Sequence, residues 1–151
     1  MMPAGRDGSA PPRIVLADDD PTNQFVIRAI LIAAGFAVEV CENGFMALEA
    51  VRRSHPDILL MDLMMPVMDG YEAARLISSD PDLDGIPILA VTARAMPGDQ
   101  EKALASGFDG YITKPVSRRA LIESVTYWLD RPISEWMPER LRKRAGFQRI
   151  A

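Results

Sequence analysis

The sequence predicts an α/β fold in which a doubly wound (βα)5 parallel sheet is followed by a short C-terminal extension. Two observations predict this fold. Five short apolar runs alternate with longer stretches of helical periodicity, which is the pattern of repeated βα units. The first, third and fourth runs are almost continuously apolar, as expected of strands that helices cover on both faces. The five predicted strands are residues 14–17, 37–40, 58–61, 86–91 and 111–113.

The second apolar run indicates the order of the strands. It carries polar residues in alternation, Glu39 and then Glu42 just after it, so we expect it at an edge of the sheet. An edge position suits the strand order 2-1-3-4-5, whose topological switch point lies between strands one and three. Ligands of such sheets bind at that point, outside the carboxyl ends of the strands.

Capping residues mark the ends of the five expected helices. Asparagine and serine side chains can accept hydrogen bonds from the first free N–H groups of a helix, and glycine suits the left-handed residue that follows its last turn. The expected helices are 22–34 before Gly35, 43–53 capped by Asn43, 70–79, one with Pro97 in its first turn and Gly107 at its far end, and one from Ser117 to about residue 130.

The chain length favours one domain with a loose end on each side. At 151 residues the chain can bury one sizeable core. We expect residues 1–12 to form a disordered arm, residues 13–130 the domain and residues 131–151 a basic extension. No run approaches the roughly 18 apolar residues of a membrane span, so we expect a cytoplasmic protein, and the single Cys41 excludes an internal disulfide.

Charge separates the body of the chain from its extension. Residues 1–130 hold 11 Lys/Arg against 19 Asp/Glu, whereas residues 131–151 hold 6 against 2. An acidic body argues against a broad contact with a phosphate backbone. Duplex DNA is therefore not an expected partner.

Polar residues follow the predicted strands at the edge where a ligand is expected. Asp18, Asp19 and Asp20 follow the first strand, and Asp62 follows the third. Two more polar residues, Thr92 and Lys114, follow the fourth and fifth strands. Strands one and three are expected to be neighbours, so their carboxylates should lie within a few ångströms of one another.

Clustered carboxylates of this kind either take up protons or hold a cation. Two like charges about 4 Å apart cost roughly 4 kcal/mol at an effective dielectric constant near 20. Hard oxygen ligands favour Mg²⁺, which keeps several waters and takes few protein oxygens. Mg²⁺ and the Lys114 ammonium could together neutralise a phosphoryl group in transfer, with Thr92 donating a further contact. Asp62 could then act as a nucleophile and form an acyl phosphate.

These residues also occur in a known pattern. Over about residues 13–130 the chain resembles CheY/DivK-like receiver domains of bacterial two-component systems, which have a flavodoxin-like fold. The segments that carry the resemblance are IVLADDDPTN (14–23), LLMDLMMPVMDG (59–70), AVTARAM (90–96) and GYITKPV (110–116).

The resemblance implies a role for each site residue. Asp62 is the phosphoacceptor and binds Mg²⁺ together with Asp19 and the backbone carbonyl of Met64, while Asp18 contacts the metal through water. Thr92 and Lys114 contact the phosphate. The remaining implied roles belong to Ala93, which leaves the phosphate room, Tyr111, the aromatic switch residue, and Pro115, which follows a cis peptide bond.

The resemblance also implies partners. The phosphoryl donor would be a sensor histidine kinase or a histidine phosphotransferase, and the target would bind the face of helix four, strand five and helix five. Such a stand-alone regulator is not an enzyme beyond its own phosphorylation and dephosphorylation. His55, the only histidine, precedes Pro56 in an expected loop and is interpreted as a surface residue. Cys41 is interpreted as a small apolar residue of the edge strand.

One enzymatic alternative shares this chemistry. Haloacid-dehalogenase-type phosphatases also use a strand-end aspartate and Mg²⁺, but they carry a second aspartate two residues later. That position is Met64 here, so the general acid of such a phosphatase is missing.

The basic extension leaves three interpretations open. A short helix over about residues 138–145 could be a solvated basic helix that docks on the body through Ile133, Trp136 and Leu141, or it could bind an acidic partner surface. The third interpretation is a nucleotide site, because arginines and a tryptophan offer phosphate contacts and a stacking plane. The extension resembles the arginine-rich tail of CheY-like proteins that bind cyclic di-GMP, which would assign this role to Trp136, Arg140, Arg142, Arg144 and Arg149.

Overall fold

The computed structural model describes residues 10–150, and the side chains of residues 10–148. Most of the expected N-terminal arm, residues 1–9, lies outside this range.

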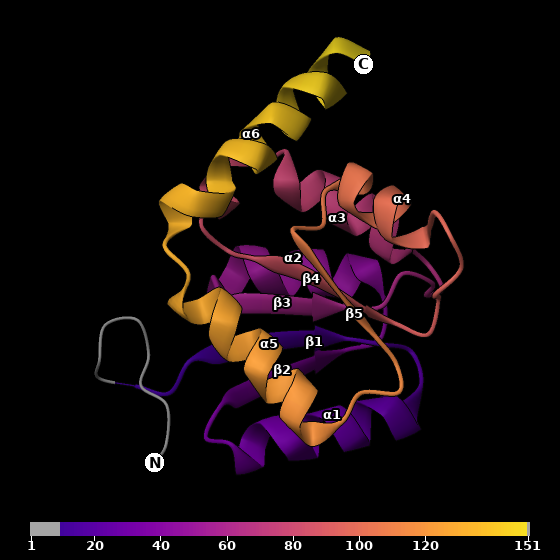
Figure 1. The fold of residues 1–151 in the computed structure, drawn as a ribbon, viewed down its shortest axis with the longest axis vertical. Coiled ribbons are helices and arrows are strands. Elements are labelled where there is room, and N and C mark those ends of the chain that lie inside the picture. Colours follow the sequence, from indigo (N-terminus) through magenta and orange to yellow (C-terminus); the bar gives the residue numbers. More distant parts are fainter. Residues whose placement is uncertain (1–9, 151) are drawn as a thin grey trace.

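Five parallel strands form one sheet in the order β2-β1-β3-β4-β5, as the sequence predicts (Figure 1). The strands are β1 (Arg13–Ala17), β2 (Ala37–Cys41), β3 (Ile58–Met61), β4 (Ile88–Thr92) and β5 (Gly110–Thr113). The helices are α1 (Pro21–Ala33), α2 (Gly44–Ser54), α3 (Gly70–Ser78), the 3-10 helix η1 (Pro81–Leu83), α4 (Asp99–Ser106), α5 (Arg118–Asp130) and α6 (Ile133–Ile150).

Helices cover both faces of the sheet (Figure 1). Helices α1 and α5 pack on one face around Leu31, Leu60 and Leu121. Helices α2, α3 and α4 pack on the other face around Leu59 and Phe108. Strands β1, β3 and β4 are therefore buried from both sides, which explains their almost continuous apolar sequence.

The capping residues act as the sequence predicts. The Asn43 side chain accepts a hydrogen bond from the Met46 amide at 2.8 Å, and Ser117 caps α5 in the same way. Gly35 follows α1 with a φ of 98°. Helix α4 starts later than expected, at Asp99 after the left-handed Gly98, so Pro97 precedes the helix and is not part of its first turn.

The C-terminal extension forms a longer helix than its sequence predicts. The expected helix was 138–145, whereas α6 spans Ile133–Ile150 and contains Pro138. Trp136 and Met137 are buried, so packing against the body stabilises the turns around the proline, which by itself disfavours a helix interior. None of the described helices has the length and apolar character that a bilayer crossing requires.

Candidate functional site

The candidate site lies at the carboxyl ends of the central strands, where the switch point was expected. Ala17 of β1 is in register with Met61 of β3, so the residues that follow them leave the sheet side by side. The Asp62 amide donates to the Ala17 carbonyl at 2.9 Å. The backbone ladder thus brings Asp18 and Asp62 to the same level of the sheet.

Lys114 joins these two carboxylates. Its Nζ lies 2.7 Å from Oδ2 of Asp18 and 3.0 Å from Oδ2 of Asp62. The Lys114 amide donates to the Thr92 carbonyl at 2.8 Å, and the Lys114–Pro115 peptide bond is cis, as the resemblance implied. Strands β1, β3 and β5 therefore each contribute one charged group to a single cluster.

The cluster is largely shielded from solvent. Only 2% of the Asp18 side chain, 16% of Asp62 and 12% of Lys114 is exposed. Desolvation lowers the pKa of Lys114, but the hydrogen bonds and negative charges of Asp18 and Asp62 outweigh it, so the net pKa is raised. The ammonium is accordingly charged at neutral pH and offsets part of the repulsion between the two carboxylates.

Backbone amides hold the two carboxylates in place. Oδ1 of Asp18 accepts from the Asp20 amide at 2.9 Å, and Oδ1 of Asp62 accepts from the Leu63 amide at 2.7 Å. Asp20 itself caps α1 by accepting a hydrogen bond from the Thr22 amide. Each carboxylate thus has one oxygen fixed by the backbone and the other directed at Lys114.

Gly70 permits the chain to pass close behind the expected phosphoacceptor. Its amide donates to the Leu63 carbonyl at 2.8 Å, and a Cβ atom at this position would lie 2.1 Å from the Asp62 carbonyl oxygen. Only glycine fits there. The sequence does not reveal this role of Gly70, because it depends on the distance between two turns.

The remaining predicted residues surround the cluster. Asp19, Ala93 and Met64 are exposed. Thr92 is buried, and its Oγ1 accepts from the Arg94 amide at 3.3 Å. The half-buried Tyr111 donates its hydroxyl to the Arg94 carbonyl. The loop after β4 therefore connects Thr92 with the expected switch residue.

The carboxylates suit a metal that uses few protein ligands. Within the described residues, no three His, Cys, Asp or Glu side chains are grouped to hold an ion. Asp18 and Asp62 are nevertheless close enough to share one ammonium, and Asp19 is adjacent in sequence. Two carboxylates with water and phosphate oxygens are the usual surroundings of Mg²⁺, so the donor set fits magnesium but not a closed protein cage.

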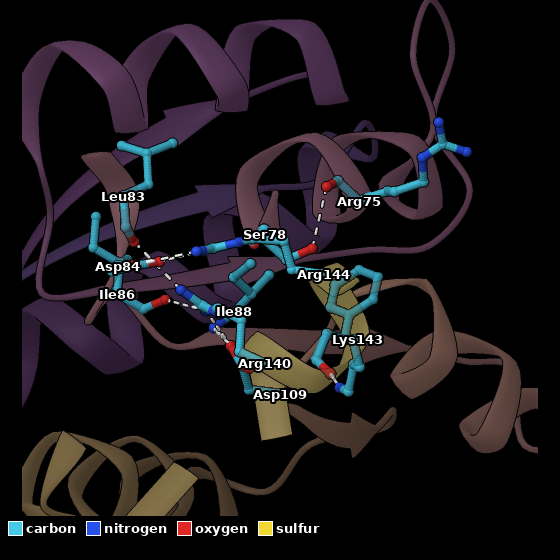
Figure 2. A network of polar contacts seen from close by, with 11 residues as sticks. Arg75, Ser78, Leu83, Asp84, Ile86, Ile88, Asp109, Arg140, Lys143 and Arg144 are labelled. Carbon is cyan, nitrogen blue, oxygen red and sulfur yellow. Dashed lines mark hydrogen bonds and ion pairs between the residues drawn. The ribbon is translucent and has the colours of Figure 1, made fainter. Parts of the chain in front are cut away.

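The proposed nucleotide residues of the extension do not form one free surface. Trp136, Arg140 and Arg144 are buried, and both arginines bind groups of the body, as Figure 2 shows. Arg142 points outward and pairs with Glu139 of its own helix, and the side chain of Arg149 lies outside the described residues. In this arrangement the extension docks on the body, as the first of the three interpretations expects. That interpretation is wrong in its details, because Arg140 and Arg144 are buried and not solvated, whereas Ile133 and Leu141, expected to dock, are exposed.

The partners of the extension were not recognised in the sequence. They are the carboxylates of Asp84 and Asp109 and several backbone carbonyls. Lys143, which was not singled out either, donates to the Phe108 carbonyl at 2.7 Å. No local pattern marks these groups, because each contact joins positions more than 30 residues apart.

Comparisons with known proteins show the family to which this chain is similar. The family model described as "Response regulator receiver domain" matches residues 14–126. DivK, the polar-differentiation response regulator of Brucella ovis, is 34% identical over 116 residues, which cover 77% of this chain and 94% of DivK. The sensor protein GacS of Pseudomonas syringae is 36% identical over 135 residues, but the match covers 87% of this chain and 15% of GacS.

A solved structure extends the comparison to the metal. The receiver domain of the sensor histidine kinase PA1611 from Pseudomonas aeruginosa is 37% identical, with a TM-score of 0.76, over 81% of this chain and 100% of that domain. That structure has a magnesium ion coordinated in its active site cleft. With the family model covering most of the described chain and the charged cluster in place, this chain belongs to the response regulator receiver domain family.

Proposed function

We propose that Asp62 accepts a phosphoryl group from a phosphohistidine of a sensor kinase or phosphotransferase, and that the chain signals as a stand-alone regulator through a changed protein-binding face. The observation that carries this proposal is the sharing of Lys114 by Asp18 and Asp62. An ammonium held between a nucleophilic carboxylate and a second carboxylate can follow the charge of an incoming phosphoryl group. Similarity to the response regulator DivK supports the signalling role.

Phosphorylation would form one bond and break another. An Asp62 oxygen attacks phosphorus, while the bond between phosphorus and the donor imidazole nitrogen breaks and its electron pair returns to the ring. One oxygen of Asp62 keeps its hydrogen bond from the Leu63 amide, which orients the other oxygen for attack. We assign Asp18, Asp19, Asp62 and the Met64 carbonyl to bind Mg²⁺, which when bound supplies positive charge against the phosphoryl oxygens.

Two further residues would respond to the phosphate. The Lys114 ammonium can transfer one of its contacts from the Asp62 carboxylate to a phosphoryl oxygen. Thr92 is buried at the end of β4, and its hydroxyl oxygen accepts a hydrogen bond from the Arg94 amide. The carbonyl of Arg94 in turn accepts a hydrogen bond from the Tyr111 hydroxyl. Movement of Thr92 towards a phosphate would alter the loop after β4 and the position of Tyr111, and with it the face of α4, β5 and α5 that we assign to the downstream partner.

Labelling tests the acceptor. The full chain is incubated with Mg²⁺ and radiolabelled acetyl phosphate, and an acid-stable, hydroxylamine-sensitive label is measured. We expect labelling of wild type, loss of the label in Asp62→Asn, and wild-type labelling in the matched control Asp82→Asn, an exposed residue of η1. Label that persists in Asp62→Asn would show that another residue is the acceptor.

A further inference from the structure

Helix α6 is fixed to the body by a side chain with no exposed surface. Arg140 is 0% exposed and is the largest fully buried side chain. Its guanidinium donates to the carbonyls of Leu83 and Ile86 and to the carboxylate of Asp109 (Figure 2). A planar guanidinium that meets acceptors on several sides fixes both the position and the rotation of the helix that carries it.

Two more cations secure the following turn of α6. Arg144 donates to the carbonyl of Ser78, the last residue of α3, and to the Asp84 carboxylate. Lys143 donates to the carbonyl of Phe108, two residues after the end of α4. The Ser78 carbonyl carries the partial negative charge of a helix C-terminus, which favours cations, and the Phe108 carbonyl lies just beyond the end of α4. The C-terminal ends of α3 and α4 are thus both tied to α6.

Aromatic contacts tie α6 to α5 as well. The rings of Trp136 and Trp128 lie 6.0 Å apart, edge to face, and the Arg140 guanidinium lies 4.7 Å from the centre of the Trp136 ring. Helix α6 therefore contacts α5 and the ends of α3 and α4, and two of these three helices belong to the face that we assign to signalling.

The body residue that Arg140 binds stands at the start of β5. The Asp109 carboxylate also accepts from the Ile88 amide at 2.8 Å, and the Asp109 amide donates to the Ile88 carbonyl at 2.7 Å. Strand β5 then runs for four residues, and Lys114 follows it. One short strand therefore connects the α6 anchor at one end with the phosphate-binding lysine at the other.

We propose that docking of α6 and phosphorylation of Asp62 oppose each other through β5. This inference rests on the proposed function. Docked α6 holds the start of β5 in one position. In that position Lys114, which follows the other end of the strand, contacts the Asp62 carboxylate. In this proposal an acyl phosphate replaces that carboxylate contact with one to a phosphoryl oxygen, and the accompanying movement of Lys114 is passed to the end of β5. Equilibrium coupling is reciprocal, hence loosening α6 favours the phosphoryl group and the phosphoryl group loosens α6.

Hydrogen exchange on the unmodified chain tests the coupling without a variant. Amide exchange is followed by mass spectrometry with Mg²⁺ alone and with Mg²⁺ plus beryllium fluoride, an analogue of a carboxylate-bound phosphoryl group. We expect faster exchange in peptides covering residues 133–148 when the analogue is bound. Unchanged or slower exchange there, together with protection around Asp62, would overturn the coupling and leave the proposed function standing.

Neighbouring cations of α6 provide a matched pair for a second test. Lys143→Gln removes a hydrogen bond to the body, whereas Arg142→Gln removes an equal charge that, within residues 10–148, pairs with Glu139 of its own helix. We expect Lys143→Gln to bind beryllium fluoride at least about twofold more tightly than wild type, and Arg142→Gln to bind as wild type does. Equal or weaker binding in Lys143→Gln overturns the coupling. If wild type failed to bind the analogue and Asp62→Asn still took up label from acetyl phosphate, the proposed function would be overturned instead.

Discussion

Arg140 and Asp109 form an ion pair in which both side chains are shielded from water, with 0% and 4% of their surfaces exposed. Burial raises the pKa of Asp109, although the Arg140 charge and hydrogen bond oppose that effect. Such a pair stabilises a fold only while both partners are present, because the loss of one leaves an uncompensated buried charge.

We therefore expect Asp109→Asn to lower the free energy of unfolding by about 3–5 kcal/mol, measured by urea denaturation. The double variant Asp109→Asn/Arg140→Met should lose less free energy of unfolding than the two single variants together, because no unpaired buried charge is left. Arg142→Gln is the control and should unfold at the wild-type urea concentration. A loss in Asp109→Asn no larger than in that control would show that the pair is not important for stability.

Two glycines provide opposite outcomes for the same substitution. Gly70→Ala places a Cβ against the Asp62 backbone, so we expect it to destabilise the chain by about 2 kcal/mol or more and to reduce acetyl phosphate labelling. Among the residues that the structure describes, nothing lies within 4 Å of a Cβ at Gly146 of α6, and alanine favours a helix over glycine by about 1 kcal/mol. Gly146→Ala should therefore stabilise the chain. Equal stability of the two variants would contradict the close approach behind Asp62.

The sheet and the site could be predicted because their signals are local. Continuous apolar runs such as residues 58–61 mark buried strands, and strand order alone places Asp18 beside Asp62. The docking of α6 could not be predicted in this way. Arg140 binds Leu83, Ile86 and Asp109, which are distant in sequence, and a basic segment looks the same whether it faces solvent or a set of carbonyls.

The boundaries of α6 show the same limit. Pro138 argued for a helix that starts at the proline, whereas the helix starts five residues earlier. A proline inside a helix costs about 3 kcal/mol or more, and the burial of Trp136 and Met137 against the body can offset such a cost. Tertiary packing therefore sets the start of α6 at Ile133, whereas the local sequence favoured a start at Pro138.

Val67 is a source of backbone strain close to the site. It has a φ of 69°, which β-branched residues rarely adopt, and its side chain is exposed. Asparagine tolerates this conformation, so we expect Val67→Asn to raise the free energy of unfolding by about 1 kcal/mol. Val67→Thr keeps the branched Cβ and should show no such gain in urea denaturation. A gain in both variants would point to the polarity of the side chain and not to its backbone.

Cys41 is expected to be unreactive in the folded chain. Burial, and then the charge of Glu39, raise the pKa of its thiol from 9.0 to about 11, against the opposing charge of Arg53. Only the thiolate reacts with iodoacetamide. At pH 8 the thiolate fraction of the folded chain should therefore be about 100-fold smaller than that of the unfolded chain.

Alkylation followed by mass spectrometry checks this expectation. The folded chain should react at least about 100-fold more slowly than the chain unfolded in urea at pH 8, and its rate should rise about tenfold for each pH unit up to pH 10. The folded chain reacts more slowly because its thiol has the raised pKa and therefore stays protonated up to a higher pH than the thiol of the unfolded chain. Folded and unfolded rates within tenfold of each other at pH 8 would show that Cys41 is accessible and ionised, as a redox-sensing cysteine would be.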